Sequence, residues 1–211
     1  MINFANDVCA VILTGGQSSR MGGGIKSLKK FNGKLIFDRI FENLQNQVQK
    51  IIINSNDLED LFANYNVEVI KDSIGDFLGP LAGIHAALEW LNIKEPHINW
   101  LITVPGDTPF IPNDLVKKLL DKAKNSRHKI VLAQSNEKTH PIIGVWHSSL
   151  FENLKKDLNS GTRKIIDWAS QHPLGYAEFT SSKYDPFFNI NYEKDIIEAQ
   201  EIENNNYFIC Q

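Results

Sequence analysis

The sequence contains little of what several classes of protein require. Only two of its 211 residues are cysteines, Cys9 and Cys210, which excludes a framework of several disulfides and a metal site built from cysteines. The longest unbroken apolar run, from Val8 to Leu13, has six residues, whereas a membrane-spanning helix needs about 20. The first residues lack a basic segment and include Asp7, so we expect no secretory signal.

Positive charge is not in excess either. The 22 lysines and arginines are outnumbered by 25 aspartates and glutamates, which argues against a dedicated nucleic-acid-binding protein. With 42% hydrophobic and 22% charged residues, the composition is typical of a soluble globular protein. We therefore expect a cytoplasmic protein with neither nucleic acid nor membrane as a partner. The length indicates a single domain over residues 1–211.

What the sequence does contain is an alternation of short β-branched runs with segments of helical period. The expected strands cover residues 8–14, 50–56, 67–72, 99–105, 129–134, 141–147 and 174–179. The expected helices cover residues 35–44, 81–91, 115–120, 148–158, 163–172 and 192–203. This order predicts an α/β protein with a mostly parallel sheet and helices on both faces. The strands at 129–134 and 141–147 could pair as a hairpin or flank a crossover, and the sequence leaves both arrangements open.

A glycine-rich segment directly follows the first expected strand, where open α/β sheets bind ligands. Residues 13–26 include five glycines together with Arg20 and Lys26. Glycines let backbone amides approach an anion, and the two basic residues add positive charge. We interpret the segment as a phosphate-binding loop, and a flexible glycine loop is the alternative. It matches neither a P-loop, because Ile25 precedes the lysine, nor a dinucleotide fingerprint, because five other residues follow Gly15-Gly16.

A single carboxylate, Asp107, follows the fourth expected strand. It stands between Pro105-Gly106 and Thr108-Pro109, and these residues stiffen the backbone around it. One aspartate opposite a phosphate loop suffices to hold Mg²⁺ against a nucleotide, because Mg²⁺ keeps several waters and takes few protein carboxylates. The alternative is an aspartate that only forms the turn. The basic loop favours the metal-binding interpretation.

Weaker signals lie at other strand ends and near the end of the chain. Asn54 and Asp72 stand at the ends of the second and third expected strands, where they could contact a base or ribose or cap turns. Asn189 and Asn191 are two positions apart, so both side chains lie on one side of an extended segment. Ligand contact and hydrogen bonding to nearby backbone are equally consistent with this spacing. The six histidines do not cluster, and we interpret His85 as structural.

Together these residues resemble those of molybdenum cofactor guanylyltransferases, one family among the enzymes that transfer nucleotides from nucleoside triphosphates. The resemblance covers most of the chain and rests on residues 13–26, 53–56, 69–73, 79–83, 105–110 and 188–191. The glycine signature alone is shared by many nucleotidyltransferases, including those that act on sugar phosphates. The stretch from Gly79 to Gly83, the proline-flanked Asp107 and the paired Asn189 and Asn191, in this order, narrow the resemblance to this family.

The resemblance implies a three-layer α/β/α sandwich with a mostly parallel mixed sheet, a Rossmann-like nucleotidyltransferase fold. It implies Mg²⁺ as cofactor, GTP as the donor substrate and molybdopterin as the acceptor, with GMP transferred to the phosphate of molybdopterin and pyrophosphate released. We expect a nucleotide-binding half over about residues 1–110 and an acceptor-side half over about residues 111–211. Transient contacts with other molybdenum cofactor proteins are also expected.

The resemblance also implies roles for individual residues. The catalytic set is Arg20, Lys26 and Asp107, and Asp107 is the Mg²⁺ ligand. The acceptor side is assigned to Asn189 and Asn191. The nucleotide contacts are Leu13, Thr14, Gly15, Lys26, Asn54, Asp72 and Asp107.

One position departs from the family pattern, because Ile25 stands where an aspartate commonly precedes the loop lysine. The change weakens any salt bridge within the loop and keeps the lysine. Two alternatives therefore stand beside the guanylyltransferase. Because glycine spacing does not identify the base, one alternative is a related nucleotidyltransferase that uses CTP or UTP with a sugar or polyol phosphate. The other, suggested by Ile25, is a catalytically weak nucleotide-binding protein.

Overall fold

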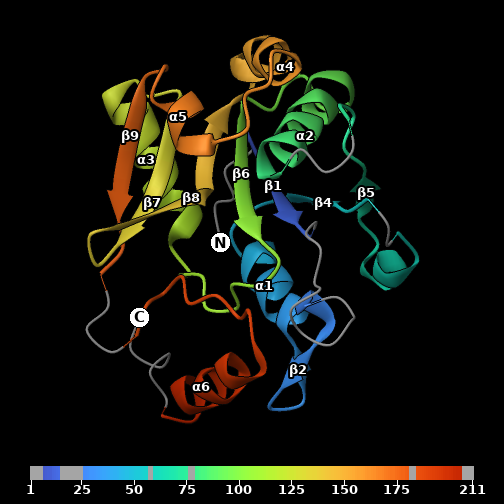
Figure 1. The fold of residues 1–211 in the computed structure, drawn as a ribbon, viewed down its shortest axis with the longest axis vertical. Coiled ribbons are helices and arrows are strands. Elements are labelled where there is room, and N and C mark those ends of the chain that lie inside the picture. The colour runs from blue at the N-terminus through green and yellow to red at the C-terminus, as the bar shows by residue number, and fades with distance from the viewer. Residues whose placement is uncertain (1–6, 15–25, 57–58, 76–78, 181–183, 206–211) are drawn as a thin grey trace.

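A seven-stranded sheet runs through the protein (Figure 1). The structure is a computed structural model, and it describes residues 7–14, 26–56, 59–75, 79–180 and 184–205. Across the sheet the strands follow the order β5-β4-β1-β6-β8-β7-β9. Strands β5, β4, β1 and β6 are parallel, β8 is antiparallel to both of its neighbours, and β9 is parallel to β7. The predicted mostly parallel mixed sheet is therefore confirmed. The strands are β1 Val8–Leu13, β4 Lys50–Asn54, β5 Glu68–Ile70, β6 Trp100–Pro105, β7 Ile130–Ser135, β8 Lys138–His147 and β9 Leu174–Glu178.

Each expected helical segment overlaps a helix of the structure. The α-helices are α1 Ile36–Gln45, α2 Pro80–Lys94, α3 Leu115–Ser126, α4 Phe151–Asn159, α5 Ile165–Ala169 and α6 Glu193–Asn204. The described residues also form three short 3-10 helices, η2 Lys26–Leu28, η3 Glu59–Tyr65 and η4 Ser148–Leu150. Over the described ranges, none of the helices has both the length and the apolar character needed to cross a bilayer.

The helices cover both faces of the sheet, as the all-apolar strands require. Along β4, Ile51 and Ile53 belong to a core cluster that includes Leu44 of α1 and residues of α3 and α6. Ile52, between them, belongs to a second cluster that includes Leu88 of α2 and residues of α4 and α5. Successive strand residues point to opposite faces, so each strand feeds both clusters. The result is the predicted three-layer α/β/α sandwich.

Strands β7 and β8 form a hairpin, which decides between the two arrangements that the sequence allowed. Ser135 of β7 pairs with Lys138 of β8, so only Asn136 and Glu137 connect the strands. Both connecting residues have positive φ, 48° and 63°. Two consecutive residues with positive φ are typical of the tight turns that join hairpin strands.

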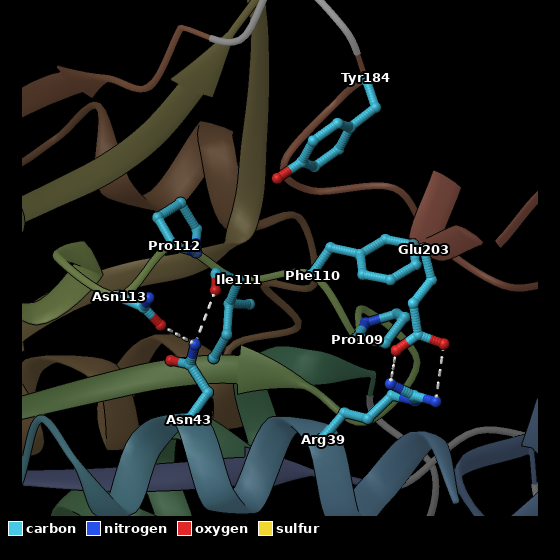
Figure 2. A pocket seen from close by; sticks show the side chains of 9 residues that line it. All are labelled: Arg39, Asn43, Pro109, Phe110, Ile111, Pro112, Asn113, Tyr184 and Glu203. Carbon is cyan, nitrogen blue, oxygen red and sulfur yellow. Dashed lines mark hydrogen bonds and ion pairs between the residues drawn. The ribbon is translucent and has the colours of Figure 1, made fainter. Parts of the chain in front are cut away.

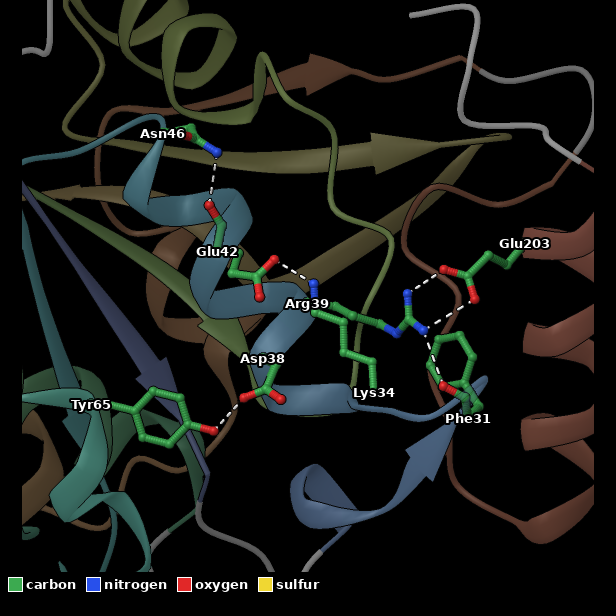
Figure 3. Close-up of polar contacts among 8 residues, drawn as sticks. All are labelled: Phe31, Lys34, Asp38, Arg39, Glu42, Asn46, Tyr65 and Glu203. Atoms are coloured by element: carbon green, nitrogen blue, oxygen red, sulfur yellow. Dashed lines mark hydrogen bonds and ion pairs between the residues drawn. The ribbon is translucent and has the colours of Figure 1, made fainter.

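A second hairpin, β2 Lys30–Phe31 and β3 Lys34–Leu35, was not predicted. It is joined to the C-terminal helix α6, because Asn32 at its turn donates to the Glu203 carboxylate at 2.7 Å. Arg39 of α1 forms an ion pair with the same carboxylate and donates to the carbonyl of Phe31 at 3.0 Å (Figure 3). Helix α6 is thus held against the N-terminal part of the chain.

Candidate active site

Four parallel strands end side by side and define one edge of the sheet. In the register of the sheet, Leu13 of β1 pairs with Asn54 of β4 and with Pro105 of β6, and Asn54 also pairs with Ile70 of β5. The residues that follow these strands therefore leave the sheet at the same edge. Open α/β sheets bind their ligands beyond the carboxyl ends of the strands, so we take this edge as the candidate active site.

Main-chain hydrogen bonds connect the strand ends at this edge. Thr14 donates from its amide and from its hydroxyl to the carbonyl oxygen of Asn54, at 3.0 and 2.9 Å. On the other side of β1, the amide of Gly106 donates to the carbonyl oxygen of Leu13 at 2.9 Å. Leu13 and Thr14, both predicted nucleotide contacts, therefore occupy the middle of the edge, and the backbone fixes their positions.

The end of the glycine-rich segment returns to this edge beside Asp107. A methyl group placed on Gly106 would lie 3.2 Å from Cγ2 of Thr14 and 3.5 Å from Cβ of Ser27. The first distance is tighter than an ordinary contact and the second is an ordinary van der Waals distance, so Gly106 lies close to Thr14 and next to η2. Ser27 follows Lys26 and Gly106 precedes Asp107, so the backbones of these two predicted catalytic residues come to the same place.

Three predicted residues lie wholly or partly outside the described part of the chain. Gly15 and Arg20 belong to the range 15–25, which is not described. Of Lys26, the first residue of η2, only the backbone is described. The predicted contacts of these side chains stay predictions.

Asn54 and Asp72 interact directly, together with Asn56. The Asn54 amide group donates to Oδ1 of Asp72 at 3.0 Å, and the Asn56 amide group donates to Oδ2 at 2.9 Å. Oδ1 of Asn56 accepts in turn from the backbone amide of Asp72 at 2.9 Å. Asn54 is only 4% exposed, so its hydrogen bonds are shielded from water. The two carboxamides fix the orientation of the Asp72 carboxylate. The sequence prediction gave Asn56 no role, and its two-residue spacing from Asn54 is the signal that identifies it.

The first turns of α2 pack against Asn54 with little space to spare. A methyl group placed on Gly83 would lie 2.4 Å from Oδ1 of Asn54 and 3.0 Å from Cδ2 of Leu13. No side chain fits at the first of these distances without displacing Asn54. Gly79, which precedes Pro80 and α2, has a φ of 80°, a conformation that glycine adopts without strain. The Gly79-to-Gly83 stretch is thus explained by the entry of α2 and by its contact with Asn54.

His85 holds the chain just after Asp72. It is fully buried on α2, its Nδ1 lies 3.1 Å from the Ser73 hydroxyl, and its ring stacks on Phe151 at a centroid distance of 5.1 Å. Burial lowers the pKa of His85, so the ring is neutral at neutral pH. These contacts agree with the interpretation of His85 as structural, and they connect α2 to the loop that carries Asp72.

The segment of residues 184–192 lies against Asp107. The amide of Ile190 donates to the carbonyl oxygen of Asp107 at 2.9 Å, and the Ile190 side chain is fully buried. Asn189 and Asn191 flank Ile190, and the side-chain amide group of Asn191 donates to Oδ1 of Asn189 at 2.8 Å. The two carboxamides therefore lie on one side of the segment, as their spacing predicted. Asp107, Asn189 and Asn191 are brought together.

A cavity of about 160 Å³ lies beyond Asp107, between α1, the 109–113 loop and α6 (Figure 2). Asn43 of α1 donates there to the carbonyl of Ile111 at 3.0 Å and to Oδ1 of Asn113 at 2.7 Å. Arg39, which also lines the cavity, forms an ion pair with Glu203. These polar groups bond to the protein itself, so we assign no substrate to this cavity. Its lining consists of Arg39, Asn43, Pro109, Phe110, Ile111, Pro112, Asn113, Tyr184 and Glu203.

The oxygen ligands available at the sheet edge fit a Mg²⁺ ion that is bound partly by the protein and partly by a nucleotide. Within the described residues, no group of three or more histidines, cysteines, aspartates or glutamates comes together. Mg²⁺ commonly binds through one or two carboxylates, several waters and the phosphates of a substrate. Asp107 provides one half-buried carboxylate directly after β6, which matches this mode of binding better than a cage of protein ligands.

Comparisons with known proteins identify a family to which this chain is similar. The family model for a MobA-like NTP transferase domain matches residues 10–174, a range that includes every strand end described above and Asp107. A molybdenum cofactor guanylyltransferase from Nitrobacter hamburgensis is 38% identical over 193 residues, which are 91% of this chain and 92% of that protein. One from Rhodopseudomonas palustris is 34% identical over 194 residues, 92% of each chain.

Among solved structures, this chain is similar to molybdopterin-guanine dinucleotide biosynthesis protein A from Archaeoglobus fulgidus. The TM-score is 0.73 at 24% sequence identity, and the match covers 94% of this chain and 99% of that one. At this identity the likeness concerns the fold, and it agrees with the three-layer sandwich and its mixed sheet.

Proposed function

The chain belongs to the MobA-like NTP transferases, the family of the molybdenum cofactor guanylyltransferases, and on this premise we propose that it transfers GMP from GTP to the phosphate of molybdopterin. An oxygen of the acceptor phosphate forms a bond to the α-phosphorus of GTP. The bond from that phosphorus to the oxygen of the leaving pyrophosphate breaks. The products are the guanine dinucleotide form of the cofactor and pyrophosphate.

The attacking group requires no general base, because a phosphate oxygen is already anionic at neutral pH. The chain must instead align two anionic substrates and neutralise their charge. Two unit charges 4 Å apart repel by about 1 kcal/mol in water and by about 4 kcal/mol near a protein surface. We assign this neutralisation to Arg20 and Lys26, which makes them catalytic residues together with Asp107.

We place GTP at the edge formed by the ends of β5, β4, β1 and β6. Leu13, Thr14 and Gly15 are proposed to contact the nucleotide where β1 ends, and Lys26 its phosphates. Asn54 and Asp72 are proposed as further nucleotide contacts. This assignment is supported by the Asn54–Asp72 hydrogen bond of 3.0 Å, which holds a carboxylate ready to accept from a donor group of the base or ribose.

Asp107 is proposed as the protein ligand of Mg²⁺. When bound, Mg²⁺ would neutralise charge on the triphosphate as pyrophosphate leaves. The carboxylate of Asp107 would hold the triphosphate end of the nucleotide near η2 through that ion. The placement of Ser27 against Gly106 supports this assignment, because it brings the neighbour of Lys26 to the neighbour of Asp107.

Molybdopterin is proposed to bind on the other side of Asp107, at residues 184–192, which we call the acceptor segment. Asn189 and Asn191 would contact the acceptor through their carboxamides. One observation carries the whole proposal: the adjacent residues Gly106 and Asp107 lie between the two sides. The carbonyl of Asp107 accepts from Ile190 of the acceptor segment, and Gly106 lies against Thr14 of the nucleotide edge.

Two coarser divisions follow from this placement and are proposed with it. Residues 1–110 would form the nucleotide-binding half and residues 111–211 the acceptor-side half, with Asp107 near the boundary. We also propose that the protein acts in the cytoplasm and makes transient contacts with other molybdenum cofactor proteins that supply the acceptor or receive the product.

The proposal is tested by incubating the purified protein with GTP labelled at the α-phosphate, molybdopterin and Mg²⁺. We expect a labelled dinucleotide and pyrophosphate in equal amounts, and neither product without molybdopterin. Parallel reactions contain CTP, UTP or ATP instead of GTP. Turnover with CTP or UTP in place of GTP would show a different nucleotidyltransferase, and binding of GTP without turnover would show a nucleotide-binding protein.

A further inference from the structure

The acceptor segment contains no helix or strand of its own within residues 184–192, yet both of its ends are fixed by carboxylates. At its C-terminal end, Oδ2 of Asp195 in α6 accepts from the backbone amides of Asn191 and Tyr192, at 2.7 and 2.8 Å. This is the capping arrangement by which a residue in the first helical turn stabilises the chain entering a helix. The N-terminal end is fixed differently, by a carboxylate of the segment itself.

That carboxylate belongs to Asp185 and bonds to the β7–β8 hairpin. Its Oδ1 accepts from the Ser135 hydroxyl at 2.8 Å and from the Phe187 amide at 2.9 Å. Ser135 is fully buried and His140 is 9% exposed, and Nε2 of His140 lies 2.7 Å from the Ser135 hydroxyl oxygen. Ser135 therefore stands between a histidine and a carboxylate, a grouping that the sequence did not reveal.

The number of hydrogens on Ser135, His140 and Asp185 fixes which of them donates in each hydrogen bond. A serine hydroxyl has one hydrogen, and Ser135 gives it to Asp185. Towards His140 the same oxygen must accept, so Nε2 of His140 carries a hydrogen and donates it. Burial lowers the pKa of His140, so at neutral pH the ring is the neutral form protonated at Nε2. His140 thus orients the Ser135 hydroxyl toward Asp185.

Contacts between aromatic rings also attach the N-terminal end of the acceptor segment to the β7–β8 hairpin, and the segment continues from there to Asp107. Phe187 packs on His140 at a centroid distance of 4.8 Å and on Phe179 at 5.2 Å. Two residues after Phe188, Ile190 donates to the Asp107 carbonyl. Only a few residues therefore separate Asp185 from Ile190, which bonds to Asp107, and Asn189 is one of them.

We propose that Asp185 is a positioning residue for the acceptor, held by Ser135 and His140 of the β7–β8 hairpin. It sets the place of Asn189 and Asn191 relative to Asp107 without touching the reacting atoms. This inference rests on the proposed function of the acceptor segment. It goes beyond that proposal because it assigns the hairpin, which contacts neither substrate in the proposal, to the alignment of molybdopterin.

Two substitutions of Asp185 test this role. D185A removes the two hydrogen bonds that the carboxylate accepts from Ser135 and Phe187. We expect kcat/KM for molybdopterin to fall about 10- to 100-fold, because displacing a substrate by about 1 Å has an effect of this size. KM for GTP is expected to stay within about twofold, since the nucleotide edge is untouched. D185N keeps an oxygen that can accept from Ser135 and Phe187, so it should recover kcat/KM to within about fivefold of wild type. D121A, which removes an exposed carboxylate of α3 paired with Lys117, is the control and should match wild type.

A second readout is the hydrogen exchange of the Ile190 amide, which should become at least about tenfold faster in D185A. Should D185A not fold, S135A provides the same comparison with the carboxylate still in place.

Equal losses of kcat/KM for GTP and molybdopterin, or wild-type kinetic constants in D185A, would overturn the positioning role. If the wild-type protein transfers no GMP to molybdopterin, the proposed function is wrong. Exchange at Ile190 then decides alone, and an unchanged rate in D185A overturns the inference.

Discussion

On the nucleotide side of the proposed active site, main-chain hydrogen bonds join the strand ends, whereas on the acceptor side two side-chain carboxylates hold the ends of a segment. On the nucleotide side, backbone amides of Thr14 and Gly106 bond the ends of three parallel strands together. On the acceptor side, the carboxylates of Asp185 and Asp195 hold a segment without regular structure. An edge built from main-chain register tolerates most side-chain changes, while a segment held by two carboxylates can be displaced by one substitution.

The largest effect is expected where the two sides meet. D107A removes the proposed Mg²⁺ ligand, and GMP transfer should fall about 10²- to 10³-fold, equivalent to about 3–4 kcal/mol, by analogy with other groups that stabilise developing charge. The carbonyl that accepts from Ile190 belongs to the backbone, so the acceptor segment should stay in place. Initial rates over a range of Mg²⁺ concentrations, with circular dichroism as a check on folding, measure the effect.

D121A again serves as the matched control, because its carboxylate is exposed on α3. A D107A enzyme that keeps the rate and the Mg²⁺ dependence of wild type would show that the two sides meet at a residue without a metal role.

An intermediate effect is expected where side-chain hydrogen bonds hold part of the nucleotide side. G83A puts a methyl group 2.4 Å from Oδ1 of Asn54, so Asn54 must move and its bond to Asp72 is lost. We expect GTP affinity to fall about tenfold and the free energy of unfolding to fall by about 1–3 kcal/mol. Calorimetric titration with Mg-GTP and chemical denaturation measure the two quantities.

The control for G83A is K94A, at the exposed C-terminal end of the same helix. It should bind GTP as wild type does. If G83A also binds GTP normally, Asn54 is not a nucleotide contact, and the nucleotide side depends on the main chain even more fully than described here.

The smallest effect is a gradual dependence of stability on pH, to which both sides contribute. Burial lowers the pKa of His85 beside the nucleotide edge and of His140 beside the acceptor segment. The unfolded chain, with histidine pKa values of about 6.5, then binds protons more readily than the folded one. The free energy of unfolding therefore falls as the pH drops below about 6.5, and is at its full value above it.

Thermal midpoints at pH 7.5 and pH 5.5 measure this dependence. H85N keeps an acceptor near the position of Nδ1 and H140Q keeps a polar group near Nε2, so each variant should show a smaller pH difference than wild type. An identical pH difference in both variants would mean that neither histidine is the source.

Strands such as β1 and β4 could be predicted from sequence because burial on both faces gives unbroken apolar runs. The β2–β3 hairpin could not, since each strand has two residues and no periodicity can be read from two. Its only signal is Asn32-Gly33, with φ values of 46° and 77°, a pair typical of tight hairpin turns.

For the site, the sequence could predict the position of residues that stand at or just after a strand end, because the sheet brings strand ends together, while their functional roles stay predictions. Asn54 and Asp72 were placed correctly at one edge for this reason. The group of Ser135, His140 and Asp185 was missed, since 50 positions separate Ser135 from Asp185 and no spacing rule connects them. Only the folded path of the chain after β9 brings this carboxylate back to the hairpin.

The attachment of α6 to Arg39 and Asn32 has a consequence for how the protein is made. Ribosomes release a chain from its N-terminus, and early parts can fold while later ones are still being added. The strands that form the proposed GTP-binding edge all precede residue 106 and can assemble during translation. The proposed acceptor side must wait until Glu203 has emerged, because the helix that carries Asp195 contacts the β2–β3 hairpin and Arg39 through that residue. On the proposed assignment, the donor side of the site would therefore form before the acceptor side.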